Sequence, residues 1–216
     1  MANFIEEVDE EVRRERLEKL WKRWSPAAIG FVVVLLAGVA GYQFWQNHRA
    51  EKAAADAAAF NAALTLAQSD KPAEAATAFA GLAGSAGKGY ALLARFQQAA
   101  NLVEAKDIAG AVAAYDAIAA SNDIDARFRN LARYMAAFHG LETLDAEAVK
   151  QRLAAIPADS PWSANARELQ AVAELKAGNT DAARQQLTAL ADDALAPAGL
   201  RGRAAEMLAA LGGPTQ

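Results

Sequence analysis

The chain has 216 residues, 54% of them hydrophobic, and its 22 Lys and Arg against 26 Asp and Glu give a formal net charge of −4. It contains no cysteine, which excludes disulfides, iron–sulfur clusters and a cysteine nucleophile. Residues 46–216 carry 16 Lys and Arg against 19 Asp and Glu and no block of basic residues, which argues against a nucleic-acid partner.

The first 24 residues are highly charged and carry a broken apolar stripe. The stripe consists of Ile5, Val8, Val12, Leu20 and Trp24. A helix with such a stripe lies along a membrane surface or docks on a partner. We therefore predict a cytoplasmic amphipathic segment over residues 1–24.

A long apolar run follows this segment. It has no charged side chain from Pro26 to Tyr42, and it reaches Trp45 if Gln43 is included. A helix of about 20 residues measures about 30 Å, the thickness of the hydrocarbon core of a bilayer. Ser25 followed by Pro26 is typical of a helix start. The aromatic residues predicted to lie at the membrane interface are Trp21, Trp24, Tyr42 and Trp45. We predict a single transmembrane signal-anchor helix over residues 25–45, embedded in the lipid bilayer.

A cleaved signal peptide is the main alternative for this run. The 25 residues before it carry seven acidic residues, whereas a signal peptide begins with a short basic region. Lys and Arg crowd the N-terminal side of the run, at Arg13, Arg14, Arg16, Lys19, Lys22 and Arg23. By the positive-inside rule the N-terminus stays in the cytoplasm. We therefore expect a single-pass protein of the bacterial inner membrane with a periplasmic C-terminal domain.

Residues 46–211 are predicted to be a repeat of short helices. Apolar positions recur at spacings of three and four, and Pro or Gly interrupts them every 15–20 residues. A small residue followed four positions later by a bulky one occurs four times, at intervals of 36, 38 and 34 residues, and an alanine lies twelve residues before each. The residues predicted to pack the repeats are Ala63, Ala75, Phe79, Ala99, Ala111, Tyr115, Ala137, Leu153, Ala171, Ala183 and Leu187. Residues 197–211 are predicted to form a capping helix, and residues 212–216 a flexible tail.

Two helices per unit, a period near 34 and Ala-x3-Phe or Ala-x3-Tyr on the second helix resemble the tetratricopeptide repeat. The resemblance implies an all-α fold, an α-solenoid of about four tetratricopeptide-like helical hairpins and a capping helix. Stacked hairpins of this kind bury a continuous core that no single unit buries alone. The Trp, Gly and Tyr that the family carries on its first helix are missing almost everywhere.

Two sets of side chains recur on the first helices of these hairpins. Aromatic residues lie three positions before the small alanine, and arginines lie four positions before it. The candidate groove residues are Phe60, Phe96, Tyr134, Arg95, Arg133 and Arg167. In tetratricopeptide stacks the first helices line the concave face, where both sets would grip an extended peptide or a helix. The alternative is that the aromatics belong to the core and the arginine stems cover it.

The whole layout resembles one particular family. The apolar run ends in GYQFWQNH at residues 41–48, and the second hairpin opens with GYALLAR at residues 89–95. Together with the charged N-terminal segment and about four degenerate repeats, these features resemble the YfgM family, ancillary subunits of the SecYEG translocon. The resemblance implies a role beside the translocon, with a membrane-anchored periplasmic chaperone of the PpiD type as a partner. It implies no catalytic residue.

No catalytic residue, cofactor or metal site is predicted. The HExxH and CxxC patterns are absent, and the glycine-rich stretch at residues 81–89 lacks the order of a phosphate-binding loop. We expect a membrane-anchored, periplasmic protein-binding module that links the Sec translocon to chaperones for exported proteins, rather than an enzyme. Two alternatives stay open: a periplasmic scaffold for envelope assembly or cell-division coordination, and a self-associating structural membrane protein.

Overall fold

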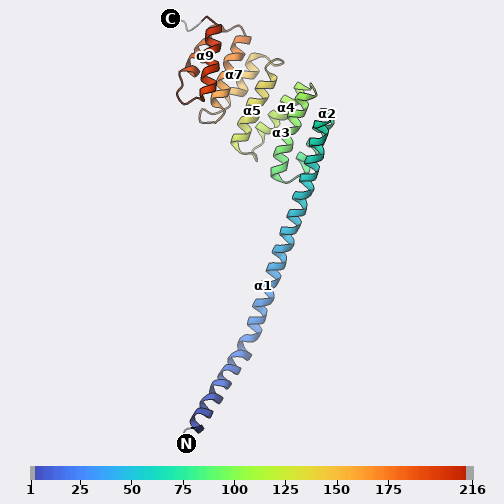
Figure 1. Ribbon diagram of the computed structural model, residues 1–216, viewed down its shortest axis with the longest axis vertical. Coiled ribbons are helices and arrows are strands. Elements are labelled where there is room, and N and C mark those ends of the chain that lie inside the picture. Colours follow the sequence, from blue (N-terminus) through green and yellow to red (C-terminus); the bar gives the residue numbers. More distant parts are fainter. Residues whose placement is uncertain (1–2, 213–216) are drawn as a thin grey trace. The chain divides into compact units, whose positions relative to one another are not determined.

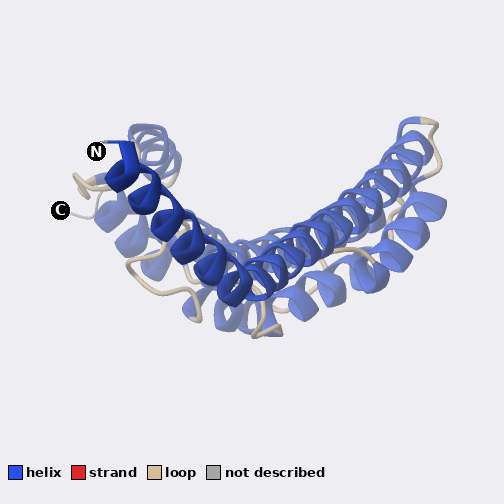
Figure 2. Ribbon diagram, turned by 90° about the horizontal axis from the view of Figure 1, so that it is seen from below, coloured by secondary structure: helices blue, strands red, loops and turns tan. Residues whose placement is uncertain are grey.

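The computed structural model describes residues 3–212, with side chains from Gly30 onward and at Arg14, Trp21, Lys22 and Trp24. Over this part the chain forms helices and loops, without a strand (Figure 2). The predicted all-α fold is therefore confirmed for the described residues. The chain divides between Ala54 and Ala55 into two compact units, which are considered separately below.

Helix α1, Asn3–Gln68, contains the charged segment, the apolar run and the first helix of the repeat region. The sequence predicts a helix start at Ser25 and Pro26, but that prediction is wrong because α1 begins at Asn3 and continues past both residues. A proline inside a helix removes one hydrogen bond. The many Glu, Arg, Lys, Leu and Ala residues on either side favour the helix strongly enough to continue it.

The predicted membrane span over residues 25–45 is not supported by the structure. Among the described residues, no helix combines the length and the apolar character that crossing a bilayer requires. The side chains of residues 25–29, at the start of the predicted span, lie outside the described ones, as do those of Ile5, Val8, Val12 and Leu20. The four aromatic residues predicted at the membrane interface are exposed: Trp21, Trp24, Tyr42 and Trp45.

The second unit is a succession of short helices that follows the last turns of α1 (Figure 1). They are α2 (Pro72–Ser85), α3 (Lys88–Glu104), α4 (Ile108–Ala120), α5 (Ala126–Gly140), α6 (Ala146–Ala154), α7 (Ser163–Lys176), α8 (Thr180–Ala191) and α9 (Ala198–Ala210). The end of α1 with α2, and then α3 with α4, α5 with α6 and α7 with α8, form the predicted hairpins. Helix α9 occupies the place predicted for the capping helix.

Four hydrophobic clusters show how the hairpins stack. In each cluster the second helix of one hairpin packs between its own first helix and the first helix of the next, as α4 packs between α3 and α5. In the last cluster α9 takes the place of a following first helix, so that Leu200, Ala204 and Leu208 cover α8. All eleven residues predicted to pack the repeats are buried. Full burial of one large apolar side chain, such as Phe79, Tyr115 or Leu187, contributes roughly 1.5–3 kcal/mol.

Three of the turns inside the hairpins share one backbone conformation. Asp70, Lys106 and Gly178 adopt a positive φ of 60°, 64° and 81°. In each turn the amide of the next residue donates to a carbonyl five residues back, for example from Asp107 to Leu102. This left-handed helix end strains residues with a side chain, whereas glycine adopts it freely.

These turns give a matched pair of substitutions with opposite expected effects. Gly178→Ala should destabilise the fold by about 1 kcal/mol because alanine is strained at positive φ. Lys106→Gly removes that strain and should stabilise the fold by up to about 1 kcal/mol. The gain is reduced because glycine increases the conformational entropy of the unfolded chain. Urea unfolding of both variants beside the wild type measures the difference. Loss of stability in Lys106→Gly would contradict the strain argument.

Candidate protein-binding grooves

The aromatic residues predicted for the groove lie at the edge of the hydrophobic clusters. Phe60 packs on Phe79, with ring centres 5.2 Å apart. Phe96 lies 6.2 Å from Tyr115, and Tyr134 is half-buried against the cluster of α5, α6 and α7. Each ring therefore contributes to the core and leaves one part on the surface.

A second aromatic set, which the sequence analysis missed, extends each of these contacts to the next first helix. Its members are Tyr90, Phe128 and Trp162. Tyr90 lies 5.6 Å from Phe60, Phe128 lies 6.5 Å from Phe96, and Trp162 lies 6.0 Å from Tyr134. Their spacings of 38 and 34 residues equal repeat intervals already visible in the sequence. That periodicity was the signal that would have found them.

Helix α5 carries two exposed aromatic side chains. Phe128 and Phe138 are 42% and 49% exposed, and Leu131 and Met135 lie between them at helical spacing. Leu93 on α3 is 53% exposed. Exposed aromatic side chains are enriched on surfaces that bind protein.

The arginines lie elsewhere, in three grooves between successive second helices. We name each groove by its arginine; the volumes are about 400 Å³ for the Arg95 groove and about 410 Å³ for each of the Arg133 and Arg167 grooves. The Arg95 groove is lined by Ala83, Gly84, Arg95, Gln98, Ala114, Ala117, Ile118 and Ser121. The Arg133 groove is lined by Asp116, Ala119, Ala120, Arg133, Gln151, Arg152 and Ala155. The Arg167 groove is lined by Leu153, Ala154, Ile156, Ala158, Ser163, Ala166, Arg167, Gln170 and Asp193.

None of the predicted groove aromatics lines these three grooves, so the structure does not bring the two predicted sets together. One residue along an α-helix turns the side chain by about 100°. Positions three and four before the small alanine therefore point to different sides of the first helix.

Each arginine is hydrogen-bonded within the chain. Arg95 Nη1 donates to Ser121 Oγ at 3.2 Å, and Arg133 Nη1 donates to Asn130 Oδ1 at 2.6 Å. Arg167 Nη2 forms an ion pair with Asp193 Oδ2 at 2.5 Å. The hydrogen bond from Arg167, followed by that from the amide of Leu195, holds the pKa of the Asp193 carboxyl below its usual range.

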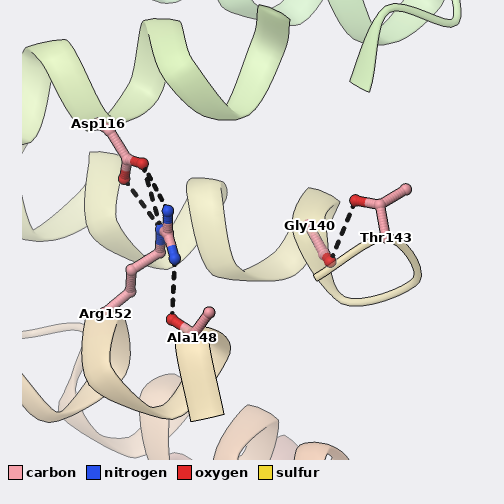
Figure 3. A network of polar contacts seen from close by, with 5 residues as sticks. All are labelled: Asp116, Gly140, Thr143, Ala148 and Arg152. Carbon is pink, nitrogen blue, oxygen red and sulfur yellow. Dashed lines mark hydrogen bonds and ion pairs between the residues drawn. The ribbon is translucent and has the colours of Figure 1, made fainter. Parts of the chain in front are cut away.

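The Arg133 groove is crossed by an ion pair between second helices (Figure 3). Arg152 on α6 donates from Nη2 to Asp116 Oδ2 on α4 at 2.7 Å and from Nε to Asp116 Oδ1 at 3.1 Å. Its Nη1 also donates to the carbonyl of Ala148 at 2.9 Å. This bidentate ion pair therefore places one negatively charged and one positively charged side chain of the protein in the groove.

A fourth groove, of about 430 Å³, adjoins the Arg95 groove, since Arg95 and Ala83 line both. We name it the Phe128 groove. It is lined by Ala83, Ala86, Lys88, Gly89, Ala91, Leu92, Arg95, Asp123, Ile124, Asp125 and Phe128.

The histidine in the repeats has a packing role. His139 stacks on Tyr115 with ring centres 5.8 Å apart and meets Phe138 edge to face at 5.1 Å. Burial lowers the pKa of His139. Among the described residues there is no group of three or more His, Asp or Glu that could hold a metal ion.

A stack of antiparallel helical hairpins with exposed aromatics and grooves between its helices defines a protein-binding repeat domain. The family model of the tetratricopeptide repeat-like domain matches residues 18–189, and the chain belongs to this family. Domains of this kind mediate contacts between proteins. Neither a curated protein nor a solved structure matches the chain.

The Arg167–Asp193 pair predicts a pH-dependent contribution to stability. Because the pKa of Asp193 is lowered in the folded state, the contribution is complete above the unfolded pKa of about 3.9 and is lost as the pH falls through the folded pKa. The stability difference between wild type and Arg167→Gln should therefore be largest above about pH 5 and shrink below about pH 4. Urea unfolding at several pH values measures it. In the Asp193→Asn background, Arg167→Gln should produce no such pH-dependent difference, and persistence of the difference would assign it to another group.

Proposed function

We propose that this protein is a membrane-anchored, periplasmic protein-binding module that works beside the Sec translocon and links it to a membrane-anchored chaperone of exported proteins. The protein-binding part rests on the exposed aromatic and aliphatic side chains of a hairpin stack that belongs to the tetratricopeptide repeat-like family. The translocon and the chaperone rest on the resemblance to the YfgM family given above.

The proposed membrane anchor is supported by exposed apolar side chains on α1. Large hydrophobic residues from Phe31 to Trp45 are between 51% and 76% exposed, on a stretch without a charged residue. Apolar surface in water costs roughly 25 cal/mol per Å², so such a surface favours burial in lipid or against another helix. The family match begins at residue 18 and so includes the run.

The C-terminal end of the run also fits a membrane interface. Tyr42 and Trp45 lie with ring centres 6.3 Å apart, and the Arg49 guanidinium lies 4.9 Å from the centre of the Trp45 ring. Tyrosine and tryptophan favour the headgroup layer, where a neighbouring cation keeps its charge in a polar environment. Arg49 would then mark the periplasmic end of the anchor.

The proposed topology can be tested with single cysteines, because the chain contains none of its own. Arg14→Cys and Glu51→Cys are placed on opposite sides of the apolar run and at exposed positions. A membrane-impermeant maleimide should label Glu51→Cys in intact spheroplasts and Arg14→Cys only after lysis. Equal labelling of both cysteines before lysis, or the reverse pattern, would contradict the proposed orientation.

The proposed partners can be tested by photo-cross-linking in native membranes. Probes placed at Ala37 in the apolar run and at Phe138 on α5 should trap a translocon subunit and a periplasmic chaperone, respectively. Leu195, which is 96% exposed in the loop before α9, is the control position and should trap neither. Adducts to the chain itself, or only to envelope-assembly or division factors, would replace the translocon role by one of the two alternatives.

A further inference from the structure

Two of the arginine grooves are built alike, and one of them shows how a carboxylate binds there. Arg167 reaches Asp193, which lies 26 residues further along the chain, and Arg95 reaches Ser121, also 26 residues further along. A glutamine follows each arginine after three residues, at Gln170 and Gln98, and lines the same groove. Ser121 therefore stands in the Arg95 groove where Asp193 stands in the Arg167 groove.

The Arg95 groove differs from the other two in charge. Asp193 lines the Arg167 groove, and the Asp116–Arg152 pair crosses the Arg133 groove. No acidic residue lines the Arg95 groove, and among the described residues Arg95 forms no ion pair. A guanidinium with only a hydroxyl partner retains donors for a carboxylate, and the side chains of Gln98 and Ser121 can donate as well.

The surroundings favour a segment of protein as the source of that carboxylate. Alanine and glycine on α2 and α4, at Ala83, Gly84, Ala114 and Ala117, leave room for a peptide backbone to approach. The adjoining Phe128 groove contains Leu92, Ile124 and the 42% exposed Phe128, which suit an apolar side chain. The acidic residues of this region, Asp123 and Asp125, line the Phe128 groove and not the Arg95 groove.

We propose that the Arg95 groove binds an extended segment of a partner protein through one Asp or Glu side chain, with an adjacent apolar side chain in the Phe128 groove. The ligand carboxylate takes the place at Arg95 that Asp193 takes at Arg167. The inference rests on the proposed role in protein binding and adds the chemistry of the bound segment. It requires neither a translocon nor a membrane anchor.

A peptide pair and three variants test the proposal. The probe is the fluorescein-labelled, C-terminally amidated peptide GSLELSG, and its counterpart GSLQLSG removes only the charge. Binding to the full-length protein, kept in solution with a mild detergent, is measured by fluorescence anisotropy. The glutamate peptide should bind at least about tenfold more tightly than the glutamine peptide, because a carboxylate accepts charge-assisted hydrogen bonds that a side-chain amide does not.

The variants separate the carboxylate site from general loss of structure. R95Q should remove the preference for the glutamate peptide. S121D leaves Arg95 in place but supplies an internal carboxylate, as in the Arg167 groove, and should remove the preference equally. R203Q, which changes an arginine paired with Glu168 between α7 and α9, makes the same change in net charge and should keep the preference. Thermal unfolding verifies that each variant is folded.

Every other outcome overturns the inference. Equal binding of the two peptides to the wild type, or no binding of either up to 1 mM, excludes the carboxylate site, as does a preference that survives in R95Q or S121D. Self-association of the protein that R95Q abolishes, without peptide binding, would assign the groove to a second copy instead. Failure here leaves the chaperone and translocon adducts at Phe138 and Ala37 untouched, so the failure of this inference is distinguishable from that of the proposed function.

Discussion

The close approach of helices at buried alanines is the constraint on which the hairpin stack depends. Ala99 on α3 and Ala136 on α5 are fully buried in one cluster with Tyr115, which is 1% exposed and fills the space between these two first helices from α4. A larger side chain at the alanine would separate the backbones, and a smaller one at the tyrosine would leave a cavity. The second helices α2, α4 and α6 are thus each fixed between two first helices, which holds the following hairpin in one register.

The same geometry determines which surface each side chain of the first helices faces. Counting back from a buried alanine such as Ala99 on α3, the third residue points to the aromatic contacts between first helices, and the fourth points into the groove between second helices. In the last hairpin the third residue before Ala171 is Glu168, which pairs with Arg203 of α9 at 2.7 Å instead of packing on a ring. Burial and this nearby carboxylate raise the pKa of Tyr134. The series of aromatic residues Phe60, Phe96 and Tyr134 therefore has no member in the last hairpin, which packs on the capping helix.

Much of this architecture could be predicted from the sequence because it depends on local spacing. The small and bulky positions, the hairpin turns and the capping helix all follow from periodicity within about 40 residues. The partners of the arginines could not be predicted, since Ser121 and Asp193 belong to loops whose positions depend on stacking. The helix start at Ser25 failed for a related reason: a local signal was outweighed by the helix-forming residues on both sides. Tyr90, Phe128 and Trp162 recur at repeat intervals in the sequence, but their contacts with the preceding first helix depend on how the hairpins stack.

Two parts of the chain have different surfaces, and together they suggest how a weakly binding groove could still hold a partner. The exposed apolar side chains from Phe31 to Trp45 favour a non-aqueous environment, whereas the hairpin domain has its own core and offers small, shallow grooves. A groove of about 400 Å³ with one arginine has room for only a few residues of a peptide, and so small a contact would bind weakly in solution. If the apolar run confines the domain to a membrane that also holds the partner, the second contact forms at a high effective concentration. Low affinity at each groove then becomes useful, because a bound segment is released quickly while the proteins stay together.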